Sequence, residues 1–162
     1  MQRPPMRPLF LAAGLLLAAF APLRAAEVEL TRVWPTWRDA ESFERITEFF
    51  TGRENTGKQV ILRSRPQARA GYYFLVRAVN PGGQIAETKF VLQIITPADP
   101  LAKTFTFPAQ LARGTTVFNL GLTGEDWPGE EAAPVAWKLE LLASDGRALA
   151  TKKSFLWEKP AK

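Results

Sequence analysis

The sequence of 162 residues contains no cysteine and no histidine. Without cysteine the chain can form no disulfide and offers no thiol for a lipid anchor. Without histidine it lacks the side chain most used in acid–base catalysis, and both absences remove the usual ligands of zinc, copper and haem. Nucleophiles activated by histidine are excluded as well. We therefore expect a non-enzymatic protein without a cofactor, and a hydrolase built on paired carboxylates stays open as an alternative.

Long apolar runs are also scarce, and the one that is present is short. Residues 9–21 are apolar, follow a start that carries two arginines, and lead to a small-residue exit. These three parts are typical of a secretory signal peptide, whereas a membrane-spanning helix needs about 20 apolar residues. We predict a signal peptide over 1–26, cleaved after Ala25 or Ala26. An uncleaved N-terminal anchor is the alternative.

Export changes the charge balance of the working protein. The whole chain has 21 Lys+Arg and 16 Asp+Glu, a net charge of +5. Three of the arginines and no acidic residue lie in the predicted signal, which leaves 18 basic and 16 acidic residues, or +2. This balance gives no electrostatic support to nucleic-acid binding. We expect one cysteine-free domain over 27–162, periplasmic or secreted by a bacterium, with no membrane span of its own.

Hydrophobic periodicity is mostly that of β-strands. In the first predicted strand, alternation places Leu30 and Arg32 on one face and Val33 on the other. The segment 72–79 is apolar on both faces except at one arginine, which predicts a central strand. The Asp145-Gly146 pair predicts a hairpin turn between the last two strands. The eight predicted strands are 27–34, 58–65, 72–79, 88–96, 103–107, 115–122, 135–142 and 148–157.

A single amphipathic helix is predicted after the first strand. Between 37 and 50, apolar residues recur at steps of three or four, with charged residues between them. We expect Pro35 to end the first strand and Thr36 or Asp39 to cap the helix. Gly52 is placed to end it in the left-handed conformation.

The last predicted hairpin carries a family resemblance. Its long strand, Asp-Gly turn and closing strand, residues 137–151 followed by 155–157, resemble the final strand pair of bacterial immunoglobulin-like domains. With the other strands, this predicts an all-β, immunoglobulin-like antiparallel β-sandwich of about seven or eight strands, with the helix inserted after the first strand. The resemblance implies architecture only, because this fold hosts many unrelated functions.

A basic stretch offers one candidate binding surface. Period two places Arg63 and Arg65 on one strand face, and Arg77 would sit across from them if the two strands pair. Such a cluster can hold a carboxylate or phosphate group bidentately. Pairing with acidic residues of the same chain is the alternative reading, and the available partners are Glu44, Glu48, Glu54 and Glu87.

The acidic loop 123–131 is the second candidate. Trp127 in this loop can stack on a sugar ring or anchor a protein interface, or it can fold back over the edge of the sheet. Clustered carboxylates suit calcium, although their spacing matches no EF-hand, and a solvated loop explains them equally well. The weak calcium candidates are Glu125, Asp126, Glu130 and Glu131.

These observations predict an exported, non-catalytic binding domain of the bacterial cell envelope that engages a protein partner. Its binding surfaces are expected at the three arginines and at the loop around Trp127. A glycan or cell-wall binding module is the alternative, with Trp127 and either Tyr72 or Tyr73 stacking on sugars.

Overall fold

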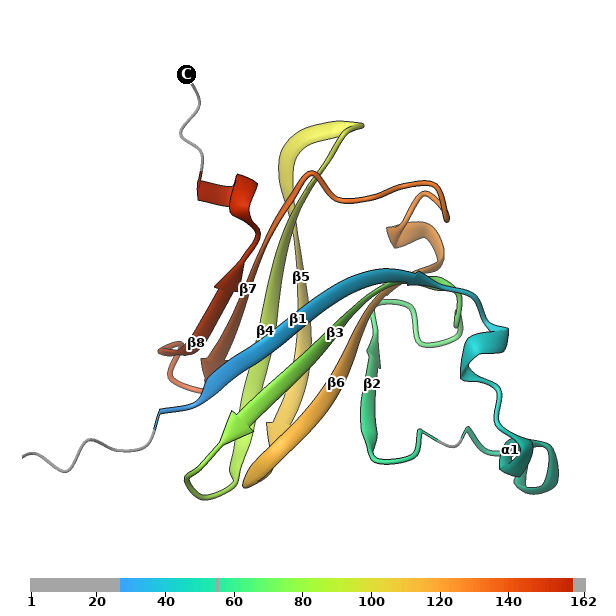
Figure 1. The fold of residues 1–162 in the computed structure, drawn as a ribbon, viewed down its shortest axis with the longest axis horizontal. Coiled ribbons are helices and arrows are strands. Elements are labelled where there is room, and N and C mark those ends of the chain that lie inside the picture. Colours follow the sequence, from blue (N-terminus) through green and yellow to red (C-terminus); the bar gives the residue numbers. More distant parts are fainter. Residues whose placement is uncertain (1–26, 55, 159–162) are drawn as a thin grey trace, which may run out of the picture.

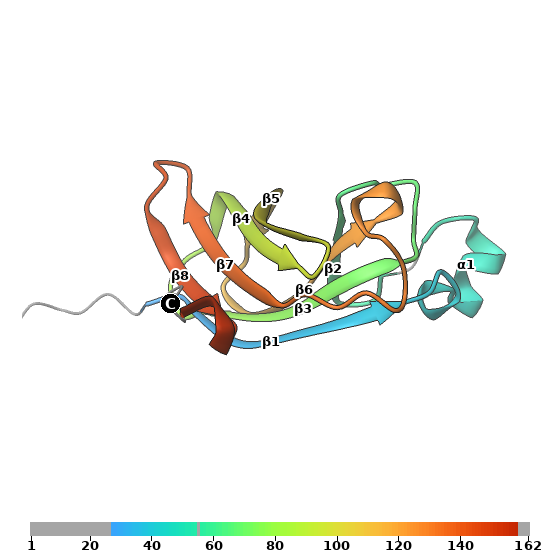
Figure 2. The same ribbon diagram turned by 90° about the horizontal axis from the view of Figure 1, so that it is seen from above.

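The computed structural model describes residues 27–54 and 56–158, so the predicted signal peptide lies outside the described residues. The described residues form two four-stranded sheets packed face to face (Figures 1 and 2). The strand order is β1-β3-β6-β2 in one sheet and β5-β4-β7-β8 in the other. The strands are β1 (Glu29–Arg38), β2 (Gln59–Arg63), β3 (Gly71–Asn80), β4 (Ile85–Thr96), β5 (Asp99–Leu111), β6 (Gly114–Thr123), β7 (Ala136–Ala143) and β8 (Ala148–Lys153).

The predicted all-β sandwich and its final Asp-Gly hairpin are confirmed. β7 and β8 pair antiparallel, and Gly146 has the positive φ of 82° that this turn requires. The described strand pairs are antiparallel with one exception, since β2 runs parallel to β6. Among the described residues there is no helix long and apolar enough to cross a membrane.

Alternate residues of the inner strands build the core between the sheets. Phe74 and Phe118 from one sheet and Phe90 from the other are fully buried. The ring centroids of Phe90 and Phe118 are 4.9 Å apart. Burying one such side chain contributes about 1.5–3 kcal/mol. The prediction that 72–79 is a central strand is confirmed, because β3 lies between β1 and β6.

Two strands run through prolines. β1 continues through Pro35 to Arg38, and β5 contains both Pro100 and Pro108. The prediction that Pro35 ends the first strand is therefore wrong. Both strands lie at the edge of a sheet, where the missing N–H of proline can face away from the neighbouring strand.

A short helix does follow β1, but the predicted continuous helix over 37–50 is wrong in extent. β1 takes up the first residues of this segment, a 3₁₀ turn covers Glu41–Phe43, and the helix α1 spans only Ile46–Thr51. Extended backbone at Arg45, with φ −123° and ψ 144°, separates the two turns. Gly52 ends α1 with φ 64°, as predicted.

A β-bulge in β1 overturns the predicted facing of its residues. The register shifts between Leu30 and Arg32, so that Thr31 is the extra residue. Arg32 then pairs with Arg77 on the outer face, while Val33 packs against the core. The prediction for Arg32 and Val33 was wrong because it assumed strict alternation, whereas the extra residue in the bulge moves both side chains to the opposite faces.

Candidate functional site

Arg63 belongs to a buried polar cluster on the outer face of the β1-β3-β6-β2 sheet. Its side chain is only 8 % exposed. Nη1 and Nη2 donate to the two carboxylate oxygens of Glu54 at 2.8 and 2.6 Å, and Nε donates to the Tyr73 hydroxyl at 2.8 Å. The hydrogen bonds between the two charged groups lower the pKa of Glu54 and raise the pKa of Arg63. This arginine is therefore engaged inside the molecule.

Tyr73 connects this cluster to the segment that follows β1. Its hydroxyl donates to the carbonyl oxygen of Arg69 at 2.6 Å, and its ring lies 4.7 Å from that of the buried Phe43. The guanidinium of Arg38 lies 3.9 Å from the centre of the Phe43 ring. Burial raises the pKa of Tyr73. These contacts fasten Phe43 and its 3₁₀ turn onto one end of the outer sheet face.

Arg65 and the acidic loop meet in an exposed ion pair. Arg65 Nε lies 3.1 Å from Asp126 Oδ2, and the arginine side chain is 56 % exposed. The other calcium candidates, Glu125, Glu130 and Glu131, are exposed. Across the described part of the chain, no group of three or more acidic, histidine or cysteine side chains is close enough to hold a metal ion. The geometry thus gives Asp126 a partner in Arg65 and supplies no ligand cluster for calcium.

Trp127 folds back over the end of the sandwich. It is 6 % exposed and stacks on Tyr72, with ring centroids 4.5 Å apart and an interplanar angle of 25°. Its indole Nε1 has no hydrogen-bond partner among the described residues. Burial raises the pKa of Tyr72, and Tyr73 is buried as well. The rings of Tyr72, Tyr73 and Trp127, which were considered for sugar stacking, are therefore buried in contacts within the protein.

Arg77 is separated from the other two arginines. β6 lies between β3, which carries Arg77, and β2, so these strands do not pair and Arg77 does not face Arg63 or Arg65. Arg77 is exposed and forms no ion pair with any described residue. The structure thus does not bring the three predicted arginines together.

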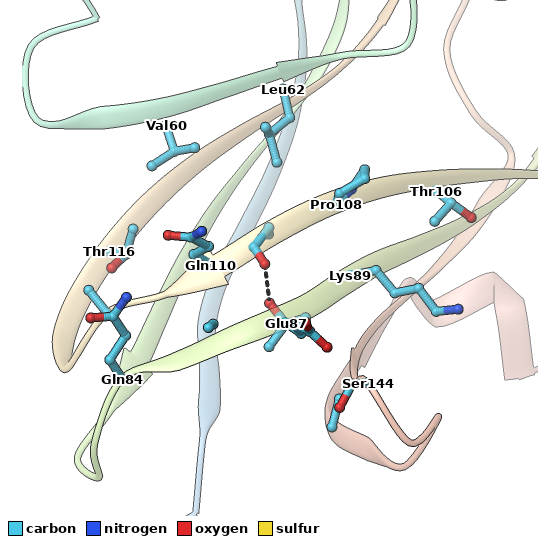
Figure 3. Close-up of a pocket in the computed structure, with 15 residues that line it drawn as sticks. Val60, Leu62, Gln84, Glu87, Lys89, Thr106, Pro108, Gln110, Thr116 and Ser144 are labelled. Atoms are coloured by element: carbon cyan, nitrogen blue, oxygen red, sulfur yellow. Dashed lines mark hydrogen bonds between the residues drawn. The ribbon is translucent and has the colours of Figure 1, made fainter.

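A groove lies along the side of the sandwich between β2 and β5. Its larger part has a volume of about 880 Å³ and its smaller part about 280 Å³, and both are lined by Leu62, Thr106 and Pro108. Figure 3 shows Val60 and Leu62 on β2 facing Pro108 and Gln110 on β5 across the larger part. We call this feature the β2–β5 groove. Its lining is mainly aliphatic or neutral, and its charged residues are Glu87 and Lys89 in the larger part and Arg63 in the smaller part.

The two strands that border the groove end their sheets on the same side of the sandwich. A sheet edge presents backbone N–H and C=O groups that can pair with another strand. On β5, Pro108 removes a donor from this free edge, since proline is tolerated in a sheet where its nitrogen faces away from the neighbouring strand. β2, with the sequence Gln-Val-Ile-Leu-Arg, contains no proline. Of the two strands that border the groove, β2 is the one whose edge is free of proline.

Local sequence patterns did not predict this groove. The only signal available was the pair of prolines in β5, which mark an edge strand once the strand is recognised as continuous. The pairing of β2 with β6, which leaves the other side of β2 open, depends on strand order and has no local signature.

Among solved structures, the chain is similar to a bacterial protein. An immunoglobulin-like protein from Pseudomonas aeruginosa matches over 80% of this chain and 96% of its own, with 17% sequence identity and a TM-score of 0.32. This neighbour is a protein of the class that the final hairpin resembles. No protein-family model and no curated protein matches the sequence.

Proposed function

We propose that this chain is an exported, non-catalytic domain of the bacterial cell envelope that binds a protein partner by accepting an extended segment in the β2–β5 groove. The observation that carries the proposal is the open edge of β2 beside a groove with a mainly apolar surface. Strand addition to a sheet edge is a recurring mode of peptide recognition, in which main-chain hydrogen bonds give affinity and side-chain pockets give specificity.

The geometry of the groove defines the chemistry of the partner. Val60 and Leu62 project from alternate positions of β2 toward the groove, opposite Pro108 of β5 (Figure 3). A strand added to β2 would place every second side chain against these aliphatic groups and the others toward solvent. The segment best suited to the groove is therefore extended, alternates apolar with polar residues, and contains no proline at its centre.

Selection from a displayed library of random dodecapeptides tests this function. We expect the enriched peptides to alternate apolar and polar residues and to bind the protein in fluorescence anisotropy. Val60→Asp should weaken their binding about tenfold or more, because it places a charge against the buried side of the peptide. Val135→Asp is the matched control, since Val135 is also partly exposed, at 44 %, but does not line the groove.

Equal binding to the Val60→Asp and Val135→Asp variants would count against the groove. So would enrichment of peptides without alternation. Melting temperatures of both variants, measured alongside, show whether a loss of binding reflects a loss of folding.

A further inference from the structure

The outer face of the β1-β3-β6-β2 sheet is open at the end away from Phe43. Strand register places Arg32 opposite Arg77, Trp34 opposite Leu75, and Arg77 opposite Val117. Both arginines are exposed, and Trp34 is 51 % exposed. We call these five residues the open face. It lies on the opposite side of its sheet from the core and does not include the β2–β5 groove.

The bulge in β1 aims Arg32 at this face. With regular alternation Arg32 would point into the core, but the extra residue Thr31 turns it outward and opposite Arg77. The Thr31 hydroxyl donates to the Arg77 carbonyl oxygen at 3.3 Å, at the position of the bulge. Bulges often re-aim a side chain next to a functional site.

The resulting arginine pair is not neutralised within the described structure. Side chains directly opposite on antiparallel strands have Cβ atoms about 4.5–5.5 Å apart, and like charges there are destabilising. Neither Arg32 nor Arg77 forms an ion pair with a described residue, and Glu29, opposite Val79, does not reach them. The guanidinium of Arg32 instead lies 4.3 Å from the centre of the Trp34 ring. Two adjacent positive charges thus face solvent beside apolar side chains.

We propose that the open face is a carboxylate-binding site for an acidic, extended protein segment. A carboxylate between Arg32 and Arg77 would accept hydrogen bonds from both guanidinium groups and relieve their repulsion. Neighbouring apolar side chains of the segment would pack on Leu75 and Val117. A protein segment fits this face better than a sugar, because Arg32 occupies a face of the Trp34 ring. The site is independent of the β2–β5 groove.

Fluorescence anisotropy with a labelled peptide of sequence Gly-Glu-Val-Glu-Leu-Glu-Gly tests the site at low ionic strength. Arg32→Gln and Arg77→Gln should each weaken binding about three- to tenfold, as expected for loss of one charged hydrogen-bonding partner at a partly exposed site. Arg77→Lys should restore part of the affinity, because it keeps the charge without the bidentate geometry. Arg53→Gln is the matched control, in the exposed loop after α1 at the opposite end of the molecule from the start of β1 (Figure 1).

Three outcomes would overturn the proposal. The first is equal weakening by Arg53→Gln, which would mean that only net charge matters. The second is tighter binding of hyaluronate than of the peptide with the same dependence on Arg32 and Arg77, which would assign the site to a carboxylated glycan. The third is a lower melting temperature in Arg32→Gln or Arg77→Gln, since relief of repulsion predicts an unchanged or higher one.

Discussion

Arg63 and Arg65 lie two residues apart in the sequence, and each forms an ion pair. The two pairs differ in how far they are shielded from solvent, and this shielding decides the strength of an ion pair. The Arg63–Glu54 pair is bidentate and shielded, with side chains 8 % and 23 % exposed. The Arg65 side chain is 56 % exposed, so water and salt screen its contact with Asp126. Breaking a shielded pair leaves an uncompensated charge, whereas an exposed pair contributes little.

Replacing each arginine by alanine should therefore have unequal effects. Arg63→Ala is expected to lower the free energy of unfolding by about 2–4 kcal/mol, because Glu54 and the Tyr73 hydroxyl both lose a partner. Arg65→Ala should change it by about 0.5 kcal/mol or less. Urea unfolding followed by tryptophan fluorescence measures both values. Similar losses in the two variants would contradict the structural role given to Arg63.

At the scale of the elements, the outer sheet face depends on a glycine in β6. Gly121 is paired with Tyr73 of the neighbouring strand β3, and the Tyr73 ring lies directly over it. The ring cannot shift easily, since it is fully buried against Phe43 and its hydroxyl is hydrogen-bonded to Arg63 and Arg69. The Tyr73 ring of β3 thus contacts both Gly121 of β6 and Phe43 of the 3₁₀ turn.

Gly121→Ala should consequently destabilise the fold. The added Cβ would overlap the Tyr73 ring, and overpacking of this kind costs about 1–3 kcal/mol. Gly83→Ala is the control, because Gly83 lies in the β3–β4 turn with open space around it and no positive φ. Thermal unfolding followed by circular dichroism compares the two. An equal shift in both melting temperatures would show that the close approach of Tyr73 does not matter.

The strands could be predicted from the sequence alone, but the path of β1 and the orientation of one of its side chains could not. Period-two alternation identified the strands, because a half-buried strand must expose every second residue. The path of β1 through Pro35 was missed because it depends on the position of β1 at a sheet edge. The turn of Arg32 to the outer face was missed because one extra residue inverts the pattern.

The candidate site was less predictable than the fold. The sequence contained four possible acidic partners for the basic stretch, and only tertiary structure selected Glu54 for Arg63 and Glu48 for Arg69. The burial of Trp127 against Tyr72 likewise depends on how loop 123–131 returns to the sheet. Contacts between residues distant in sequence decide these points, and local periodicity carries no information on them.

At the scale of the whole molecule, a sandwich of two open sheets has four edge strands, and they differ in their ability to pair. β5 contains Pro100 and Pro108, and β1 contains Pro35 together with a bulge. β8 is six residues long and mostly exposed, and the β2–β5 groove does not extend to it. β2 combines a proline-free edge with a groove whose surface is mainly apolar. We therefore assign strand capture to the edge of β2.

Amide hydrogen exchange, followed by NMR with and without a library-selected peptide, tests that assignment most directly. In a parallel strand some N–H groups already bond to the neighbour, and the others face the free edge. We expect peptide binding to slow the exchange of the free-edge amides within 59–63 and to leave the exchange of the β1 amides unchanged. Protection confined to β1 or β8, or no change within 59–63 at saturating peptide, would contradict it.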